Sequence, residues 1–588
     1  MKHLLTGNEA IARGAYEAGV TVAAAYPGTP STEILENTAK YKEIYSEWSP
    51  NEKVAMEVAI GASIAGARSM AAMKHVGVNV AADPLFTYAY TGVNGGFVFI
   101  SADDPGMHSS QNEQDNRYFA KMSKIAMLEP SDSQEAKDFM IEGFRISEEF
   151  DVVVMLRLTT RICHSKTLVE FGEREEFKMK EYKKNIPKFV ATPVNARGLH
   201  VKLEDKLKKL EEFSNNTPLN KIEWGNKKIG IVTSGVSYQY AKEVFGEDVS
   251  YFKVGFSHPL PMKKIKEFAS QVETLYVIEE LEPYMEEQMK AAGINCIGKE
   301  KIPLIGELNP DIIAKAMKGE ERELLDVDIS LAAPRPPIMC AGCPHRGIFY
   351  VLSRKKNVMV SGDIGCYTLG SVEPLYAMDT CICMGSSVSA GHGAQVAFDF
   401  NNIKKKVVGV IGDSTFFHSG ITGLLDIVYN RGNALTIILD NRITGMTGHQ
   451  ENPGSGYTLM GDKAPIINIP KLVEACGIKN IKVINPLNIK DTEKIVDEAL
   501  SSDEASVIIT KWPCVLKKFT EEDIEEFGNE RVLCKVNEET CKTCRICGKV
   551  GCPAISFNDK AYIDENMCVG CHVCMQVCPF EAIEKAGV

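Results

Sequence analysis

The chain has 588 residues with 47 glycines and 18 cysteines, and 44% of its residues are hydrophobic while 24% are charged. This length exceeds what one hydrophobic core supports, so we expect three or four domains, and the composition excludes a disordered or collagen-like protein. The formal net charge of -12 argues against nucleic acid or an anionic membrane as partner, because both attract basic surfaces.

The N-terminal residues 1–9 are too polar for a signal peptide, which predicts a cytoplasmic protein. The longest uncharged run, from Pro84 to Asp103, contains a Gly-Gly pair and polar residues, so we expect a turn and a buried strand there and no membrane anchor. Cysteines in an unexported chain indicate metal binding or catalysis instead of disulfides.

Short apolar runs recur along the chain, with helical segments between them. Runs that are apolar on both faces and alternate with helices are typical of parallel sheets covered by helices. We therefore predict a multidomain α/β fold with parallel sheets, whose strands include residues 20–26, 96–101, 152–158, 228–233, 275–278, 407–411, 435–439 and 506–510.

Three changes in composition predict domain boundaries. Residues 166–227 are charged and aperiodic, residues 333–337 are rich in proline, and an acidic stretch after Cys514 leads into a cysteine-rich tail. We expect domains at residues 1–190, 226–330, 331–520 and 530–588, with a connector at 191–225.

The segment 407–443 combines a strand, a Gly-Asp-Ser turn, a helix and a second strand that runs into Asn441. It resembles the motif by which thiamine enzymes hold Mg²⁺ against a diphosphate, although Ser414 stands where the usual motif has a third glycine. Magnesium prefers octahedral oxygen ligands, so an acid, an amide and a backbone carbonyl suit it. The candidate cofactor-binding residues are Gly412, Asp413, Ser414, Asn441 and Ile443, with Asp413, Asn441 and the Ile443 carbonyl as metal ligands.

Eight cysteines of the tail form two Cys-x2-Cys-x2-Cys runs, each followed by a fourth Cys-Pro, as in bacterial two-cluster ferredoxins. Three thiolates of such a run hold one 4Fe-4S cluster, and the fourth crosses to the other cluster. The first cluster is therefore assigned to Cys541, Cys544, Cys547 and Cys578, and the second to Cys568, Cys571, Cys574 and Cys552. The first run has one extra residue before Cys552. Cys534 lies outside both runs and is interpreted as structural.

A pair of zinc knuckles is the alternative interpretation, because zinc also uses Cys-x2-Cys pairs. A tetrahedral zinc site would leave the third cysteine of each run without a role, which favours iron–sulfur clusters. Such clusters pass single electrons, so an electron donor is expected elsewhere in the chain or complex.

Three further stretches accompany the diphosphate motif, at residues 340–346, 362–366 and 445–450. With it they resemble the thiamine diphosphate-dependent 2-oxo acid:ferredoxin oxidoreductases, and the likeness extends over essentially the whole chain. Many members of this family hold a cluster close to the thiamine. The resemblance implies a possible third 4Fe-4S cluster on Cys340, Cys343, Cys366 and Cys514. The alternative is that some of these are ordinary buried cysteines, as we expect of Cys381, Cys383 and Cys476.

The resemblance also extends to the pyrimidine-binding half of the family, through residues 26–31 and 51–55. Thiamine enzymes place a carboxylate against N1′ of the aminopyrimidine. The family's catalytic glutamate maps onto Glu52, and Glu57 is the rival because a glycine follows each at the same spacing. The family's ligands for the substrate carboxylate map onto Thr29 and Arg117.

The domain order implied by the resemblance is a pyrimidine domain, a transketolase C-terminal-like domain, a diphosphate domain and a two-cluster ferredoxin, as in the alpha subunits of the indolepyruvate branch. That branch oxidatively decarboxylates arylpyruvates to arylacetyl-CoA and CO2, and passes the electrons to ferredoxin. The implied partners are coenzyme A as co-substrate, ferredoxin, and a small beta subunit carrying the coenzyme A-associated domain that this chain lacks, in a homodimer of heterodimers.

Three other functions are weighed against this one. Another 2-oxo acid:ferredoxin oxidoreductase would prefer a different substrate. A non-redox thiamine decarboxylase would release an aldehyde and reduce no dye. An electron-transfer scaffold would have lost the thiamine site, against which the presence of Glu52, Asp413 and Asn441 speaks.

Overall fold

The computed structural model describes residues 2–321, 327–333, 336–529 and 531–587. The chain divides into two compact units, residues 1–327 and 328–588. Part of the proline-rich break predicted at residues 333–337 lies outside the described residues. No helix among the described residues is long and apolar enough to cross a membrane.

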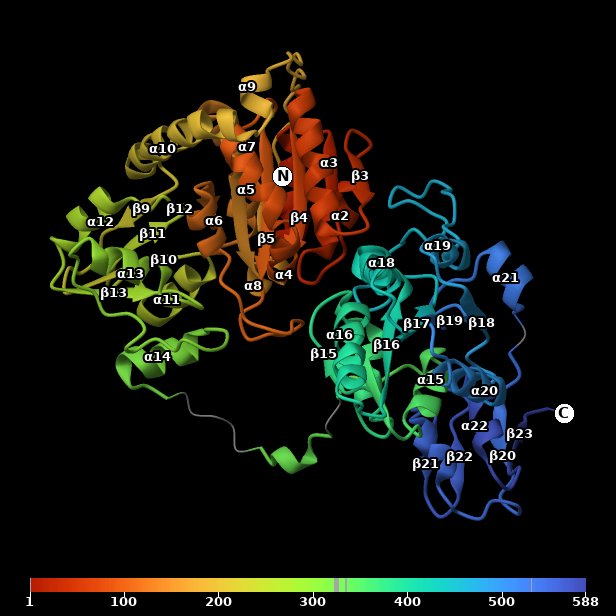
Figure 1. The fold of residues 1–588 in the computed structure, drawn as a ribbon. Helices are drawn as coiled ribbons and strands as arrows, with labels where there is room; N and C mark the ends of the chain where they lie inside the picture. The colour runs from red at the N-terminus through yellow and green to blue at the C-terminus, as the bar shows by residue number, and fades with distance from the viewer. Residues whose placement is uncertain (1, 322–326, 334–335, 530, 588) are drawn as a thin grey trace. The chain divides into compact units, whose positions relative to one another are not determined.

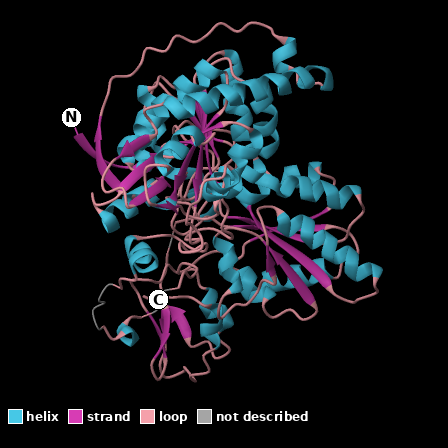
Figure 2. Cartoon of the chain, turned by 90° about the vertical axis from the view of Figure 1, so that its left-hand side faces the viewer, coloured by secondary structure: helices cyan, strands magenta, loops and turns pink. Residues whose placement is uncertain are grey.

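The main sheet of the first unit has seven strands in the order β12-β6-β7-β5-β4-β2-β3, all parallel except β12. Helices flank its strands (Figures 1 and 2), and every residue of β5, β6 and β7 is buried. The strands are β2 (Val22–Ala25), β3 (Tyr45–Trp48), β4 (Ser69–Lys74), β5 (Phe97–Asp103), β6 (Ala126–Leu128), β7 (Val154–Thr159) and β12 (Phe256–His258). The helices are α1 (Gly7–Glu17), α2 (Thr32–Thr38), α3 (Glu52–Ala65), α4 (His75–Val80), α5 (Ala82–Thr91), α6 (Arg117–Ser123), α7 (Ser133–Phe150) and α8 (Thr160–His164).

A second sheet of this unit has the order β13-β10-β11-β9, and only β9 is antiparallel to its neighbour. The segment that forms this sheet also contributes β12 to the main sheet, so the two sheets are interlocked. The strands are β9 (Lys221–Glu223), β10 (Ile229–Ser234), β11 (Ser250–Val254) and β13 (Thr274–Ile278), and the helices are α11 (Val236–Phe245), α12 (Met262–Ala269), α13 (Tyr284–Ala291) and α14 (Pro310–Lys318).

The charged segment predicted as an aperiodic connector contains regular structure. Strand β8 (Lys166–Glu170) pairs with β1 (Lys2–Thr6), and α9 (Ile186–Phe189) precedes the long helix α10 (Pro193–Asn216). Leu199, Leu203 and Leu210 are buried on one side of α10. Such a narrow apolar stripe is hard to detect among so many charged residues, because most of the helix surface faces water.

The second unit contains a six-stranded parallel sheet in the order β15-β14-β16-β17-β19-β18. Its strands are β14 (Val358–Gly362), β15 (Thr380–Cys381), β16 (Lys406–Gly412), β17 (Leu435–Asp440), β18 (Asn480–Ile484) and β19 (Ser506–Lys511). Its helices are α15 (His345–Leu352), α16 (Ser386–Phe400), α17 (Asp413–Thr415), a π-helical turn (Phe416–Gly420), α18 (Ile421–Tyr429), α19 (Ile469–Ala475), α20 (Ile489–Leu500) and α21 (Glu521–Phe527), with 3-10 turns at Ile329–Leu331 and Cys366–Ser371.

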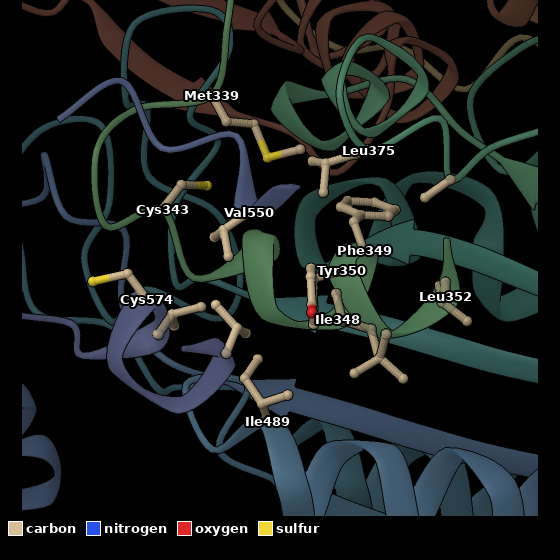
Figure 3. Close-up of a cluster of buried hydrophobic side chains, with 14 of the residues drawn as sticks. Met339, Cys343, Ile348, Phe349, Tyr350, Leu352, Leu375, Ile489, Val550 and Cys574 are labelled. Atoms are coloured by element: carbon tan, nitrogen blue, oxygen red, sulfur yellow. The ribbon is translucent and has the colours of Figure 1, made fainter. Parts of the chain in front are cut away.

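The cysteine-rich tail folds as two short antiparallel ribbons, β20 (Cys534–Val536) with β23 (Ile583–Lys585) and β21 (Ile555–Phe557) with β22 (Ala561–Ile563). A 3-10 turn (Ile546–Val550) and α22 (Val573–Val577) complete it. Its apolar residues share one hydrophobic cluster with the sheet of this unit. Figure 3 shows Val550 and Cys574 of the tail together with Ile348 and Tyr350 of α15, all members of this hydrophobic cluster. The tail is therefore packed onto the preceding domain. The fold class expected from the sequence is confirmed, and every strand predicted above is present.

Candidate functional site

Glu52 is the first residue of α3, and its side chain is buried at 5% exposure. The preceding Asn51 caps the helix by accepting a hydrogen bond from the Val54 N–H, which fixes where the helix begins. Gly77 of α4 packs against the carboxyl group, since a Cβ at this glycine would lie 2.7 Å from Glu52 Oε1. The rival, Glu57, is exposed and forms an ion pair with Lys53. Burial therefore favours Glu52 as the acid that meets a cofactor.

Lys74 ends β4 beside Glu52, a position that the sequence analysis missed. Its stem lies against the Gly28 turn, where a Cβ would be 3.2 Å from Lys74 Cδ, and its Nζ donates to the Ser109 carbonyl at 2.8 Å. Burial lowers the pKa of Lys74, and the carboxylates of Asp104 and Glu52 oppose that shift. A lysine that ends an otherwise apolar strand is the signal that could have revealed it. Thr29 lies next to Gly28 and is half-buried.

Arg117 lies in a buried ion-pair network. Its guanidinium, 1% exposed, pairs with Asp115 and with Glu279 at 2.6 Å each, and donates to the carbonyls of Glu280 and Glu282. These contacts tie α6 to the end of β13. A guanidinium so engaged has little left to offer a substrate carboxylate. The role expected from the sequence stays a prediction that this geometry does not favour.

The diphosphate motif lies at the carboxyl ends of β16 and β17. Asp413 follows β16, is 2% exposed, and accepts hydrogen bonds from the Ser414 N–H at 2.8 Å and from Asn452 Nδ2 at 3.3 Å. Asn441 and Ile443 follow β17 and are also buried. Asn452, which the sequence analysis did not identify, is thus part of this cluster.

The charges around the diphosphate motif favour the binding of a cation. Burial, and next the nearby Asp440 carboxylate, raises the pKa of Asp413 well above its usual value. Two neighbouring buried carboxylates are costly unless a positive charge joins them. The donor set of acid, amide and backbone carbonyl fits Mg²⁺ with a diphosphate, so Asp413, Asn441 and Ile443 are the residues that would hold them.

The cysteines expected to hold a third iron–sulfur cluster lie beside the diphosphate motif. They are Cys340, Cys343, Cys366 and Cys514. A Cβ at Gly445 would lie 3.4 Å from Cys366 Sγ and 3.9 Å from Asn441 Nδ2, and the Cys514 N–H donates to the Asn441 carbonyl at 3.0 Å. Burial raises the pKa of Cys366 to about 11, and the thiols of Cys514 and Cys340 add to the shift. Burial likewise raises the pKa of Cys343 to about 12, with Cys514 and Cys366 contributing. All four thiols are thus close enough to one another to interact.

The tail cysteines gather in the two crossed sets expected from the sequence. Burial raises the pKa of Cys547, and the thiols of Cys578, Cys544 and Cys541 raise it further. Burial raises the pKa of Cys571 to about 11, and its contributing neighbours include Cys552 and Cys568. The fourth thiol of each run therefore lies with the other run. Thiols close enough to raise one another's pKa can share an iron–sulfur cluster, because the positive charge of iron offsets the cost of forming several thiolates together.

Three other cysteines differ from expectation. Cys534 does not lie apart, since its N–H donates to Cys568 Sγ at 3.5 Å and its thiol contacts Cys574, which makes it a fifth thiol of the second set. Cys381 and Cys383 are exposed and not buried, whereas Cys476 is buried as expected. Among the described residues, no group of three or more His, Cys, Asp or Glu side chains is arranged to hold a metal ion.

These folds and sites define a thiamine-type α/β enzyme joined to an iron–sulfur module. Three family models match the chain. They are the pyruvate flavodoxin/ferredoxin oxidoreductase thiamine diphosphate-binding domain at residues 13–202, the C-terminal domain of thiamine pyrophosphate enzymes at 363–510 and the 4Fe-4S binding domain at 561–584.

Full-length relatives specify the family further. The chain is 42% identical to the indolepyruvate oxidoreductase subunit IorA of Archaeoglobus fulgidus, over 100% of this chain and 98% of the relative. It is 41% identical to IorA of Pyrococcus abyssi, over 99% and 96%. The 2-oxoglutarate synthase subunit KorA of Methanothermobacter thermautotrophicus is 30% identical over 29% of this chain and 48% of the relative. The chain belongs to the IorA family of indolepyruvate oxidoreductase subunits, and it is an oxidoreductase with thiamine diphosphate and 4Fe-4S domains.

Replacing Asp413 with Ala is expected to weaken the binding of Mg²⁺ and thiamine diphosphate roughly 100-fold or more, because even residues that only support metal ligands contribute about 10–100-fold. Isothermal titration of cofactor-free protein measures this. Asp426→Ala, which removes an exposed acid on α18, is the matched control. Equal affinities of Asp413→Ala and the unmodified protein would contradict the assignment.

If the two cysteine sets of the tail are crossed, substitutions within one set should affect the same iron–sulfur cluster. Cys578→Ser should alter the same electron paramagnetic resonance signal as Cys541→Ser, and Cys552→Ser the same signal as Cys568→Ser. Anaerobically reconstituted protein serves for the spectra, and Cys476→Ser is the control. A grouping by order along the chain, with Cys578→Ser resembling Cys568→Ser, would refute the crossing.

Proposed function

We propose that this chain is the catalytic subunit of an arylpyruvate:ferredoxin oxidoreductase of the indolepyruvate type. In this reaction an arylpyruvate, coenzyme A and two oxidised ferredoxins give an arylacetyl-CoA, CO2, a proton and two reduced ferredoxins. The observation that carries the proposal is the position of Cys366 and Cys514 against Asn441. It puts a cluster-sized group of thiols next to the diphosphate motif, where a redox thiamine enzyme needs an electron acceptor.

The chain's own residues have distinct tasks in this proposal. Asp413, Asn441 and the Ile443 carbonyl hold Mg²⁺ and the diphosphate. Glu52 holds a proton at N1′ of the aminopyrimidine, and its burial under Gly77 keeps water from competing for that proton. Thiamine diphosphate, when bound, supplies the electron sink that permits loss of CO2.

Lys74 and Thr29 are the donors that we assign to the substrate carboxylate. Lys74 lies near Glu52, and among the described residues its ammonium donates to the Ser109 carbonyl. An ammonium group has three donors, so Lys74 can reach a carboxylate as well. Arg117 lacks this freedom because two carboxylates already hold it.

Partners follow from the same proposal. The relatives' names describe a subunit, which supports a second chain that carries the coenzyme A-associated domain. Ferredoxin accepts the electrons from the tail clusters, and the assembly is a homodimer of heterodimers. A second candidate function, oxidation of 2-oxoglutarate, is suggested by the partial similarity to KorA.

Substrate class is tested with the chain co-purified anaerobically with its small partner. Viologen dye reduction and thioester formation are measured with indolepyruvate, phenylpyruvate, pyruvate and 2-oxoglutarate. We expect the two aryl substrates to have the highest kcat/KM. A higher kcat/KM with 2-oxoglutarate would favour the second candidate function, oxidation of 2-oxoglutarate. Aldehyde release without dye reduction would refute both candidate functions.

Glu52→Gln is expected to lower kcat by roughly 100-fold to 10,000-fold, the usual contribution of a positioned acid–base group. Glu57→Gln changes an exposed glutamate of the same helix and should leave kcat within about twofold. Cofactor affinity is measured in parallel, since Glu52→Gln should retain the diphosphate. The reverse ranking of the two variants would assign the role to Glu57.

Lys74→Met is expected to raise KM for the arylpyruvate by roughly tenfold or more, since a hydrogen bond to a charged group contributes about 1.5–3 kcal/mol. Thiamine diphosphate affinity should not change, because Lys74 is assigned to the substrate alone. Steady-state kinetics at limiting and at saturating thiamine diphosphate distinguish a change in KM for the arylpyruvate from a change in cofactor affinity. An unchanged KM would remove Lys74 from the site.

A further inference from the structure

Arg346 is a buried cation on the second position of α15, 2% exposed. Its Nε and Nη2 donate to the Cys340 carbonyl at 3.0 Å each, and Nη2 also donates to the Met339 carbonyl. Its Nη1 donates to the carbonyls of Val550, at 3.2 Å, and Gly551. One guanidinium therefore joins the loop that carries Cys340 to the turn that precedes Cys552 of the tail.

The charge of Arg346 has no carboxylate partner among the described residues. The other buried arginines of the described chain each pair with two carboxylates. They are Arg68 with Glu148 and Glu175, Arg117 with Asp115 and Glu279, Arg157 with Asp103 and Glu129, and Arg442 with Asp523 and Glu526. Backbone carbonyls satisfy the N–H groups of Arg346 but do not neutralise its charge. A buried charge without compensation is costly.

The groups placed to compensate it are thiols from two different cysteine sets. The backbone N–H of Arg346 donates to the Cys343 carbonyl at 3.2 Å, and its guanidinium donates to the Cys340 carbonyl, so it is held by the loop of the third set. A small cavity is lined by Arg346 together with all five thiols of the second set, those of Cys534, Cys552, Cys568, Cys571 and Cys574. In Figure 3, Cys343, Val550 and Cys574 lie toward the same end of α15.

We propose that Arg346 is the shared counter-ion of the second and third iron–sulfur clusters. This inference rests on the proposed function, in which the two cysteine sets hold clusters. A cluster bound by four thiolates is negatively charged, and more so after reduction, so a fixed cation between two of them stabilises both reduced states. Net charge and hydrogen bonding near the sulfurs set cluster potentials. Arg346 is thus a positioning residue that raises both potentials and fixes the two cluster loops to each other.

Two substitutions of Arg346 distinguish the effect of its positive charge from the effect of its hydrogen bonds. Arg346→Gln removes the charge and keeps an amide donor, whereas Arg346→Lys keeps the charge and loses the planar fork. Arg354→Gln is the control, since Arg354 is exposed and stacks on Tyr350. Each protein is purified anaerobically and reconstituted with iron and sulfide. Its iron content is measured, and its clusters are titrated under electron paramagnetic resonance.

We expect Arg346→Gln to shift the potentials of both clusters to more negative values by 59 mV or more, a tenfold or larger change in the one-electron equilibrium constant. Arg346→Lys should stay close to the unmodified protein. If Arg346→Gln fails to retain iron while Arg346→Lys retains it, the charge is required for the clusters and the proposal stands.

Equal potentials in all variants would overturn the proposal, as would an equal shift or an equal loss of iron in Arg346→Gln and Arg346→Lys, because the residue would then act only as a structural clamp. A lack of cluster signals in the unmodified protein would instead refute the proposed function.

Discussion

Charge buried away from water is the constraint on which the candidate sites of this protein depend. Asp413 and Asp440 repel each other beneath the diphosphate motif, the thiols gather in three sets that each include a buried member, and Arg346 lies near thiols and has no carboxylate partner among the described residues. None of these groups is neutralised well by the protein alone. In the proposed function, cofactors of opposite charge would compensate each group, with a magnesium ion at the carboxylates and iron–sulfur clusters at the thiols. The burial of these charges is unfavourable in the cofactor-free chain, and it preorganises the chain to bind the proposed cofactors.

Parallel sheets explain how residues far apart in sequence reach one site. The carboxyl ends of adjacent parallel strands meet at one edge of a sheet, and that edge is where α/β folds bind ligands. In the second unit, β16 delivers Asp413, β17 delivers Asn441, and the loops after β14 and β19 deliver Cys366 and Cys514. In the first unit, β4 delivers Lys74 beside Glu52 by the same rule.

Packing of the tail connects the thiamine chemistry to electron transfer. The hydrophobic cluster that contains Ile348 and Phe349 continues through Val550 and Val573 of the tail. Dense packing of this kind limits relative motion. It holds the second cysteine set close to the third, with Arg346 joining their loops. In the proposed function, the electrons would therefore leave the diphosphate motif through cysteine sets that are held together by this packed core.

The sequence alone determined the parallel strands, the diphosphate turn and the cysteine sets, because each depends on residue types at short, fixed spacings. The crossing of Cys552 and Cys578 was expected from the likeness of the two runs to those of bacterial two-cluster ferredoxins. Tertiary structure decided what spacing cannot express. It favoured Glu52 over Glu57 by burial, engaged Arg117 with Glu279, and brought Cys534 to the second set. Lys74 and Arg346 were likewise recognised only from their surroundings. Burial and charge pairing depend on which distant segments pack together, and no local pattern records that.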